Sequence, residues 1–283
     1  MPETTETLNE EILSRSRQVE KDLYVARQLQ QSLLPPELTP TPPELRAALE
    51  AAGLDFQISK CHYQSERFRV SGLYVPCDSL GGDFYDFMKF ADSDIGVTVA
   101  DVSGHGVPAA FITAIFKASF YRMIHGAQTP GDLLYQLNNE LSGIIKTGDY
   151  ITGVYARVDE ANGALTYSGA GHPYPFVYRA ATGAIERLSE NGPPLVWFRD
   201  MEYPVGRITM APGDKTLIFS DGLSEMKNAK RELFGEEALE ALFLEHASKP
   251  SSLLLDSMLM ALSDFTEGHP LEDDLSVALI EAI

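Results

Sequence analysis

The chain has 283 residues, 44% hydrophobic and 22% charged, which suits one large globular domain, alone or with a small appendage, and excludes disorder throughout. It carries 41 acidic against 22 basic residues, a net charge of −19, so it lacks the positive footprint of a nucleic-acid-binding protein. It has neither a run of about 18 apolar residues nor the layout of a secretory signal at its start. We therefore expect a cytoplasmic protein with no nucleic-acid or membrane partner.

The first periodic segment spans residues 8–33. Its seam recurs at alternating four- and three-residue spacings, as in the a and d positions of a short coiled coil: Ile12, Ser16, Val19, Leu23, Ala26, Gln30 and Leu33. The polar residues Ser16 and Gln30 weaken this seam. Prolines end the helix, and the stretch 36–43 follows as an extended, proline-rich connector. The periodicity leaves two interpretations open: a helix packed on its own domain, or a helix that dimerises and transmits a signal.

The next part of the chain reads as strands followed by helices. We predict a short helix at 45–52, strands at 56–62 and 68–76, a strand that opens after Asp83 and one that closes at Asp101. A helix begins after Gly106, and a second spans 130–145. The first of these helices is expected to bury the face formed by Val107, Ala110, Phe111, Ala114, Ile115 and Ala118.

The second half of the chain begins with a predicted β-meander at 150–188. A strand then ends at Asp221, two helices follow at 235–245 and 251–265, and a last strand spans 275–280. Successive strands with short connections favour antiparallel pairing. Runs of strands interrupted by helices indicate an α+β fold.

Four strand ends in this pattern carry acids: Gly81-Gly82-Asp83, Asp101-Val102, Asp221-Gly222 and Asp273-Asp274. Carboxylates on rigid strand ends beside glycine are the oxygen ligands that hard divalent cations prefer. A single Asp-Gly after a strand is usually a turn. Four acid-bearing strand ends together have one economical explanation, which is that they converge on one site.

Five motifs occur in order: Gly-Gly-Asp-Phe-Tyr-Asp at 81–86, Asp-Val-Ser-Gly-His-Gly at 101–106, Ala-Gly-His-Pro at 170–173, Ser-Asp-Gly-Leu-Ser-Glu at 220–225 and Asp-Asp-Leu-Ser at 273–276. On these motifs the sequence resembles the metal-dependent serine/threonine phosphatases of the type 2C (PPM) superfamily, in their bacterial partner-switching branch (RsbU/SpoIIE-like). The resemblance implies an α-β-β-α sandwich of two antiparallel sheets flanked by helices and preceded by a linker helix. It divides the chain into linker helix and connector at 1–43 and a phosphatase domain at 44–283.

The resemblance also implies a site. Asp83, Asp101 and Asp221 match metal ligands through which a bound water would act, the carbonyl of Val102 matches a main-chain ligand, and Asp273 is favoured over Asp274 as the last ligand. Two Mg²⁺ or Mn²⁺ ions are expected, because these oxygen ligands lack the thiolates and imidazoles that select zinc. Such ions activate water for attack on a phosphate ester. The general acid and the phosphate-binding residue stay unassigned.

Other residues have two possible roles each. His172 either shapes the site or has a structural role, and the structural role is favoured. Asp86 and Glu225 are either hydrogen-bond partners of the ligands or solvated turn residues. Trp197 and Phe198 form either an exposed partner-binding patch or part of the core, and burial is favoured.

The leading hypothesis is thus a Mg²⁺/Mn²⁺-dependent protein-serine phosphatase. The resemblance suggests a phosphorylated anti-sigma-factor antagonist of the STAS type as substrate, a homodimer formed through the N-terminal helix, and an upstream sensor or receiver module in cis or in trans. The competing hypothesis is a catalytically weak, phosphatase-like dimeric scaffold. A nucleotidyl-transfer enzyme is disfavoured because the chain has no Gly-x-x-x-x-Gly-Lys loop.

Overall fold

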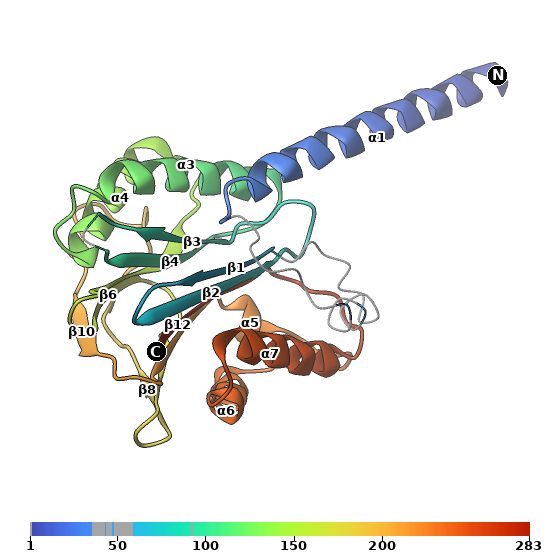
Figure 1. Ribbon diagram of the computed structural model, residues 1–283. Helices are drawn as coiled ribbons and strands as arrows, with labels where there is room; N and C mark the ends of the chain where they lie inside the picture. Colours follow the sequence, from blue (N-terminus) through green and yellow to red (C-terminus); the bar gives the residue numbers. More distant parts are fainter. Residues whose placement is uncertain (1, 36–42, 44–46, 48–58, 92) are drawn as a thin grey trace.

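A computed structural model of the chain describes residues 2–35, 43, 47, 59–91 and 93–283. In this part of the chain two six-stranded sheets lie face to face, with helices on their outer sides (Figure 1). Sheet A has the order β1 (Ser59–Gln64), β2 (Phe68–Val75), β12 (Leu275–Ala282), β11 (Lys215–Phe219), β7 (Phe176–Arg179), β8 (Ala184–Arg187). Sheet B has the order β10 (Gly206–Thr209), β6 (Ala164–Ala170), β5 (Ile151–Val158), β4 (Ile95–Val102), β3 (Phe84–Lys89), with β9 (Asn191–Gly192) beside β6.

The helices form the outer layers. The elements outside the sheets are α1 (Pro2–Gln31), α3 (Val107–Met123), α4 (Pro130–Ile144), α5 (Gly222–Glu225), α6 (Glu236–His246) and α7 (Ser251–Thr266). Helices α3 and α4 lie on sheet B, and α5 to α7 lie on sheet A. Neighbouring strands in the described residues are antiparallel, except that the short β9 runs parallel to β6. The predicted α-β-β-α sandwich is confirmed.

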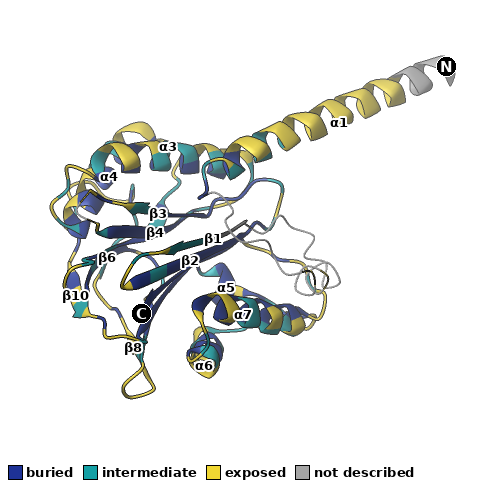
Figure 2. Ribbon diagram, viewed as in Figure 1, coloured by how far each residue is buried: buried dark blue, intermediate teal, exposed yellow. Residues whose placement is uncertain are grey.

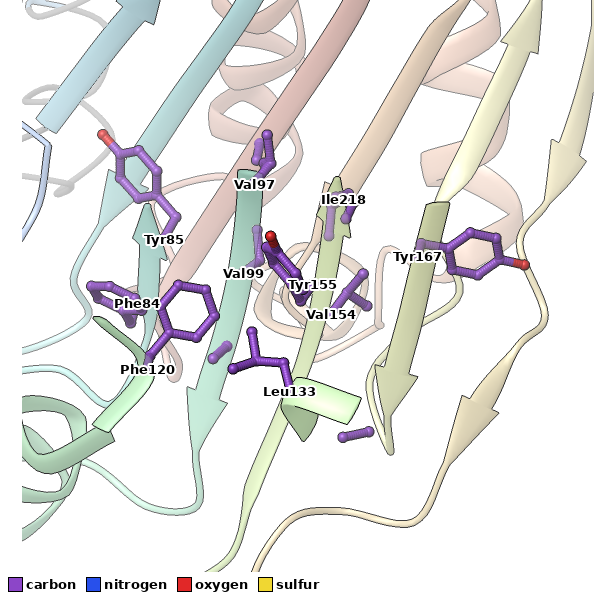
Figure 3. Close-up of a cluster of buried hydrophobic side chains, with 14 of the residues drawn as sticks. Phe84, Tyr85, Val97, Val99, Phe120, Leu133, Val154, Tyr155, Tyr167 and Ile218 are labelled. Atoms are coloured by element: carbon purple, nitrogen blue, oxygen red, sulfur yellow. The ribbon is translucent and has the colours of Figure 1, made fainter. Parts of the chain in front are cut away.

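The core consists of two apolar clusters, which bury both faces of the sheets. Between the sheets, Val97 and Val99 of β4 and Ile218 of β11 belong to the larger cluster (Figure 3). On the outer side of sheet B, the ring of Phe120 from α3 lies 5.5 Å from that of Tyr155 in β5. Because removal of apolar surface from water dominates folding, these layers hold the strand ends in fixed relative positions.

Two sequence predictions about this architecture are wrong. The apolar face assigned to the first helix is not the buried one, since Val107 and Phe111 of α3 are 43% and 66% exposed while Ile112 and Phe116 are buried. The apolar residues of α3 are distributed over its whole circumference, so their spacing does not indicate which face is buried. The predicted meander is also split: β5 and β6 belong to sheet B, whereas β7 and β8 form a hairpin in sheet A. Strand β10 and helix α5 were not predicted.

Helix α1 projects from the domain (Figure 1), and Figure 2 shows most of its described surface exposed. Early seam positions such as Ile12 and Val19 are 57% and 56% exposed, whereas Gln30 and the following Leu34 are buried against the domain. The predicted helix at 8–33 is therefore observed, with its last turns packed on the domain. The predicted connector at 36–43 and helix at 45–52 lie almost wholly outside the described residues.

Among the described residues, no helix combines the length and the apolar composition that crossing a membrane requires.

Candidate metal and catalytic site

Strand register brings the four acid-bearing ends to one end of the sandwich. In sheet B, Phe84 pairs with Ala100, so that the preceding Asp83 lies across from Asp101. In sheet A, Phe219 of β11 pairs with Val277 of β12, which places the segments that carry Asp221 and the Asp273-Asp274 pair at the same end. Asp101 interacts electrostatically with acids of both of these segments. The acids thus meet although they are far apart in the chain.

Two of the acids in this cluster, Asp83 and Asp274, are buried and accept hydrogen bonds that connect neighbouring backbone segments. The carboxylate of Asp274 accepts hydrogen bonds from the backbone N–H groups of Cys77 (2.7 Å), Gly82 (2.7 Å) and Asp83 (3.2 Å). The Ser220 hydroxyl donates to Asp83 Oδ2 at 2.6 Å and accepts from the N–H of Ser276 at 2.9 Å. Because Ser220 and Asp274 belong to the ends of sheet A and Asp83 precedes β3 of sheet B, these bonds join the two sheets at the site.

Glycine is required here by close approach of the backbone. A Cβ atom added at Gly82 would lie 2.5 Å from the carbonyl oxygen of Val102, and one added at Gly222 would lie 2.0 Å from the carbonyl oxygen of Asp274. No real Cβ makes such contacts, so any other residue would push the segments apart. The Val102 carbonyl therefore lies beside the segment that carries Asp83.

The carboxyl groups of the cluster are unfavourable as bare anions. Burial and the neighbouring Asp101 and Asp274 raise the pKa of Asp83. Burial, then Asp221 and Asp273, raise the pKa of Asp101 to about 7, although a hydrogen bond with Asp83 acts in the opposite direction. Burial is also the main cause that raises the pKa of Asp221, and it raises that of Asp273 to about 6. A divalent cation would relieve this repulsion.

The donor set fits a hard cation in its chemistry. Within the part of the chain that the structure describes, no group of three or more His, Cys, Asp and Glu side chains is already arranged as a metal site. The acids nevertheless interact electrostatically, and the available ligand atoms are carboxylate and carbonyl oxygens. Such ligands suit Mg²⁺ or Mn²⁺ rather than zinc.

The two neighbouring acids at the start of β12 differ in availability. Asp274 is buried, and backbone N–H groups already use both of its carboxylate oxygens. Asp273 is exposed and lines a hollow of about 200 Å³ together with Gly222, Glu225 and Lys227. Of the two, Asp273 is the one whose carboxylate can turn toward a cation.

The residues with two possible roles resolve differently. Buried His172 has Nδ1 2.9 Å from Thr152 Oγ1, and Thr152 pairs with Asp101 across β4 and β5. Burial lowers the pKa of His172 to about 3, so the ring is neutral. These contacts agree with a structural role beside the site.

Asp86 is not a solvated turn residue. Its buried carboxylate accepts the hydroxyl of Tyr121 at 2.6 Å and pairs with Lys117 Nζ at 3.0 Å, which ties β3 to α3. Glu225 is exposed and lines the hollow with Asp273. The expected burial of Trp197 and Phe198 is wrong: they are 58% and 59% exposed.

Sequence reasoning missed two residues that hold the site. Ser220 is the first residue of the motif at 220–225, but nothing in the local pattern indicated that its hydroxyl reaches Asp83. Gln30 was noted only as a weak seam position, yet its amide donates to the carbonyl of Gly81 at 2.6 Å and accepts from the Gly81 N–H at 3.2 Å. Its polar side chain in a largely apolar seam was the available signal, and Ser16 of the same seam shares it.

Comparison with solved structures defines the class of this domain. The SiaA-PP2C domain of Pseudomonas aeruginosa superposes with a TM-score of 0.75 at 21% identity, covering 94% of this chain and 98% of that one. The catalytic domain of the serine threonine protein phosphatase PstP, solved with two manganese ions, gives a TM-score of 0.56 at 14% identity, covering 77% of this chain and 99% of that one. The fold is that of PP2C-type phosphatase domains.

Sequence comparison narrows the class. The profile of the family described as Stage II sporulation protein E (SpoIIE) matches residues 91–282, and the chain belongs to this family. Phosphoserine phosphatase RsbU of Bacillus subtilis (strain 168) is 27% identical over 220 residues, which covers 77% of this chain and 64% of RsbU. The chain spans about half to two thirds of the length of such curated relatives. The resemblance seen in the five motifs is confirmed.

Proposed function

We propose that this chain is a metal-dependent protein-serine phosphatase. The observation that carries the proposal is the meeting of Asp83, Asp101, Asp221 and Asp273 at one end of the sandwich, where burial raises the pKa values of all four and repulsion by neighbouring acids adds to it at Asp83, Asp101 and Asp273. A relative of the same family, RsbU, is described as a phosphoserine phosphatase. Family membership and an all-oxygen cluster of acids together support hydrolysis of a phosphate ester.

In this proposal the four aspartates and the carbonyl of Val102 hold two Mg²⁺ or Mn²⁺ ions. When bound, these ions supply Lewis-acid activation of water and neutralise phosphate charge. The chain itself positions the ligands: Asp274 and Ser220 hold the segment of Asp83, and neutral His172 packs beside the strand of Asp101. The manganese found in PstP, which shares the fold, supports this choice of metal.

The proposed substrate is a small phosphorylated regulator, a STAS-type anti-sigma-factor antagonist. We further propose a cytoplasmic homodimer that forms through α1, controlled by a sensor or receiver module in cis or in trans. The proposed division is a linker at 1–43 and a phosphatase domain at 44–283. Exposed apolar residues along α1 support dimerisation through it: Leu8, Ile12, Leu13, Val19, Tyr24, Val25 and Leu29.

Phosphate release from a serine-phosphorylated STAS protein tests the proposal. We expect activity with Mn²⁺ and loss of activity with EDTA, and we expect Asp221→Asn to lower kcat/KM at least about a hundredfold. Glu237→Gln, at an exposed acid of α6, is the control and should keep full activity. Equal rates with and without Mn²⁺ would contradict the proposal. Binding of the phosphoprotein without turnover would favour the scaffold instead.

A further inference from the structure

Two exposed aromatic residues and a partly buried tyrosine form a platform at the edge of the candidate site. Trp197 and Phe198 are 58% and 59% exposed, and the Trp197 ring stacks on Tyr150 with a centroid distance of 5.3 Å and an interplanar angle of 30°. The Phe198 ring lies 6.1 Å from that of Trp197. We call Tyr150, Trp197 and Phe198 the aromatic platform. Water covers these large apolar surfaces in the free chain, which is unfavourable unless a partner covers them.

The backbone under the platform is held rigidly. Buried Asn138 of α4 donates to the carbonyl of Phe198 at 2.6 Å and accepts from the N–H of Val196 at 2.8 Å. The adjacent Asn139 accepts from the N–H of Asp200 at 2.9 Å. The exposure of the two rings is therefore a property of an ordered segment.

This segment also contains backbone strain. Val196 has φ 78° and Asp200 has φ 58°, so left-handed conformations flank the two exposed aromatic residues. A β-branched residue rarely adopts this region, and such strain persists where the surrounding structure imposes it, often at functional sites. A segment that only had to connect β9 and β10 would not need this geometry.

The platform is continuous with the acid cluster. Tyr150 donates its N–H to Ser103 Oγ at 3.0 Å, and its carbonyl accepts the N–H of Ser103 at 3.0 Å. Ser103 directly follows the Asp101-Val102 pair, so the stacked rings stand beside a segment that carries two of the proposed ligands. A protein whose phosphoserine reached the acids would therefore have the platform within its reach.

Charge gives an independent reason for an apolar contact. The chain has a net charge of −19, and a phosphoserine adds about −2 to its carrier. Long-range electrostatics therefore do not favour the approach of an acidic phosphoprotein. Tryptophan is enriched among the residues that dominate binding energy, and a pre-ordered ring loses little entropy on binding. A rigid indole beside the site can supply the affinity that charge does not.

We propose that the aromatic platform is the docking site for the folded surface of the phosphoserine-bearing substrate protein, which covers the Trp197 indole with an apolar patch next to its phosphoserine. This inference rests on the proposed phosphatase function of the adjacent site. It assigns recognition of the protein to the platform and chemistry to the acids, so the two roles can be separated by experiment.

The kinetic test compares a protein substrate with a small one. We expect Trp197→Ala to lower kcat/KM for a serine-phosphorylated STAS protein about thirtyfold, mainly through KM, and to leave hydrolysis of p-nitrophenyl phosphate within about twofold. Phe198→Ala should act in the same direction and serves if the first variant does not fold. The control is Leu253→Ala, at a 56% exposed residue of α7 on the opposite layer, which should change neither rate. Equal losses on both substrates, or no loss on either, would overturn the proposal.

A binding test does not depend on catalysis. Trp197 is the single tryptophan of the chain, so with a phosphoprotein that lacks tryptophan the intrinsic tryptophan fluorescence reports on the platform alone. In the presence of EDTA, the phosphoprotein should shift the emission to shorter wavelength and protect the indole from iodide. If the emission shifts but no hydrolysis occurs in Mn²⁺, docking is supported and the phosphatase proposal is contradicted. If hydrolysis occurs but the emission does not shift, docking at the platform is overturned.

The same signal distinguishes other occupants of the platform. A shift that grows with the concentration of the chain alone would indicate a second copy, and one caused by vesicles of anionic phospholipid would indicate a lipid surface. Either result, without a response to the phosphoprotein, overturns the proposal.

Discussion

The acids at the end of the sandwich fall into two groups that do different work. Asp83 and Asp274 are 3% and 1% exposed and accept hydrogen bonds that join the two sheets. Asp101 and Asp221 are partly buried and Asp273 is exposed, and their pKa values are raised, as is that of Asp83. The first group stabilises the structure of the site, and the second group has few positive charges or donors to compensate its negative charge.

This difference explains how a protein tolerates a cluster of like charges. A buried carboxylate is stable when hydrogen bonds surround it, and each bond to a charged group contributes about 1.5 to 3 kcal/mol. The more open acids accept fewer such bonds, as at Asp273, whose Oδ1 accepts one from the N–H of Asp274 at 2.8 Å, and they gain most from a cation. If this division is correct, substitutions in the first group should mainly lower stability, whereas substitutions in the second group should mainly weaken metal binding.

The largest effect on stability is expected from the acid pair at the start of β12. Asp274→Asn should lower the free energy of unfolding of the metal-free protein by about 3 kcal/mol, because the new amide group would face backbone N–H donors. Asp273→Asn removes the same charge from the same cluster but should leave stability unchanged or raise it slightly. Urea unfolding in EDTA measures both. Equal effects of the two variants would remove the distinction between the groups.

The second prediction concerns the pH dependence of the open acids. An unfolded aspartate has a pKa of about 3.9, whereas folding raises that of Asp101 to about 7 and that of Asp273 to about 6. The folded protein therefore binds more protons over this interval, and its stability must fall as the pH rises through it.

Thermal unfolding in EDTA between about pH 5 and about pH 8 tests this sign. Asp101→Asn should flatten the curve. Excess Mn²⁺ should reverse the slope, because a cation binds the deprotonated carboxylates and so favours the folded state at higher pH. A metal-free protein that gains stability from pH 5 to pH 7 would contradict the raised pKa values.

A somewhat smaller loss of stability is expected when the Ser220 hydroxyl, which links the two sheets, is removed. Ser220→Ala takes away the donor to Asp83 and leaves the N–H of Ser276 without its acceptor, which should cost about 2 kcal/mol. It should also weaken Mn²⁺ binding, since Asp83 loses its orientation. Ser252→Ala, at an exposed serine of α7, is the control and should stay within about 0.5 kcal/mol. A loss of stability without weaker Mn²⁺ binding would restrict Ser220 to a packing role.

The smallest effect on stability is expected from the contact between Gln30 of α1 and Gly81. Gln30→Ala removes two hydrogen bonds to Gly81 and should lower stability by about 1 kcal/mol. The neighbouring Gln28→Ala, at an exposed position of the same helix, should have almost no effect. Chemical unfolding of the two variants side by side provides the comparison. If both behave like the wild type, α1 does not help to hold the Asp83 segment.

Much of the fold could be read from the sequence because it depends on local patterns. Apolar runs that end on an acid predicted β4 and β11, and Pro130 with the spaced leucines predicted α4. The spacing failed at α3, where apolar residues surround the helix and Phe111 points to solvent. It also failed after β6, because no local signal states which sheet a strand will join.

For the site, the sequence by itself determined the acids, the glycines beside them and the family to which they point. The tertiary structure decided their division of labour: which of Asp273 and Asp274 is enclosed by backbone N–H groups, that Ser220 reaches Asp83, and that Trp197 stays in water. The physical reason is that motif and periodicity are properties of neighbouring residues. Hydrogen-bond saturation and burial depend on partners contributed by distant strands, and only the packed sheets bring these together.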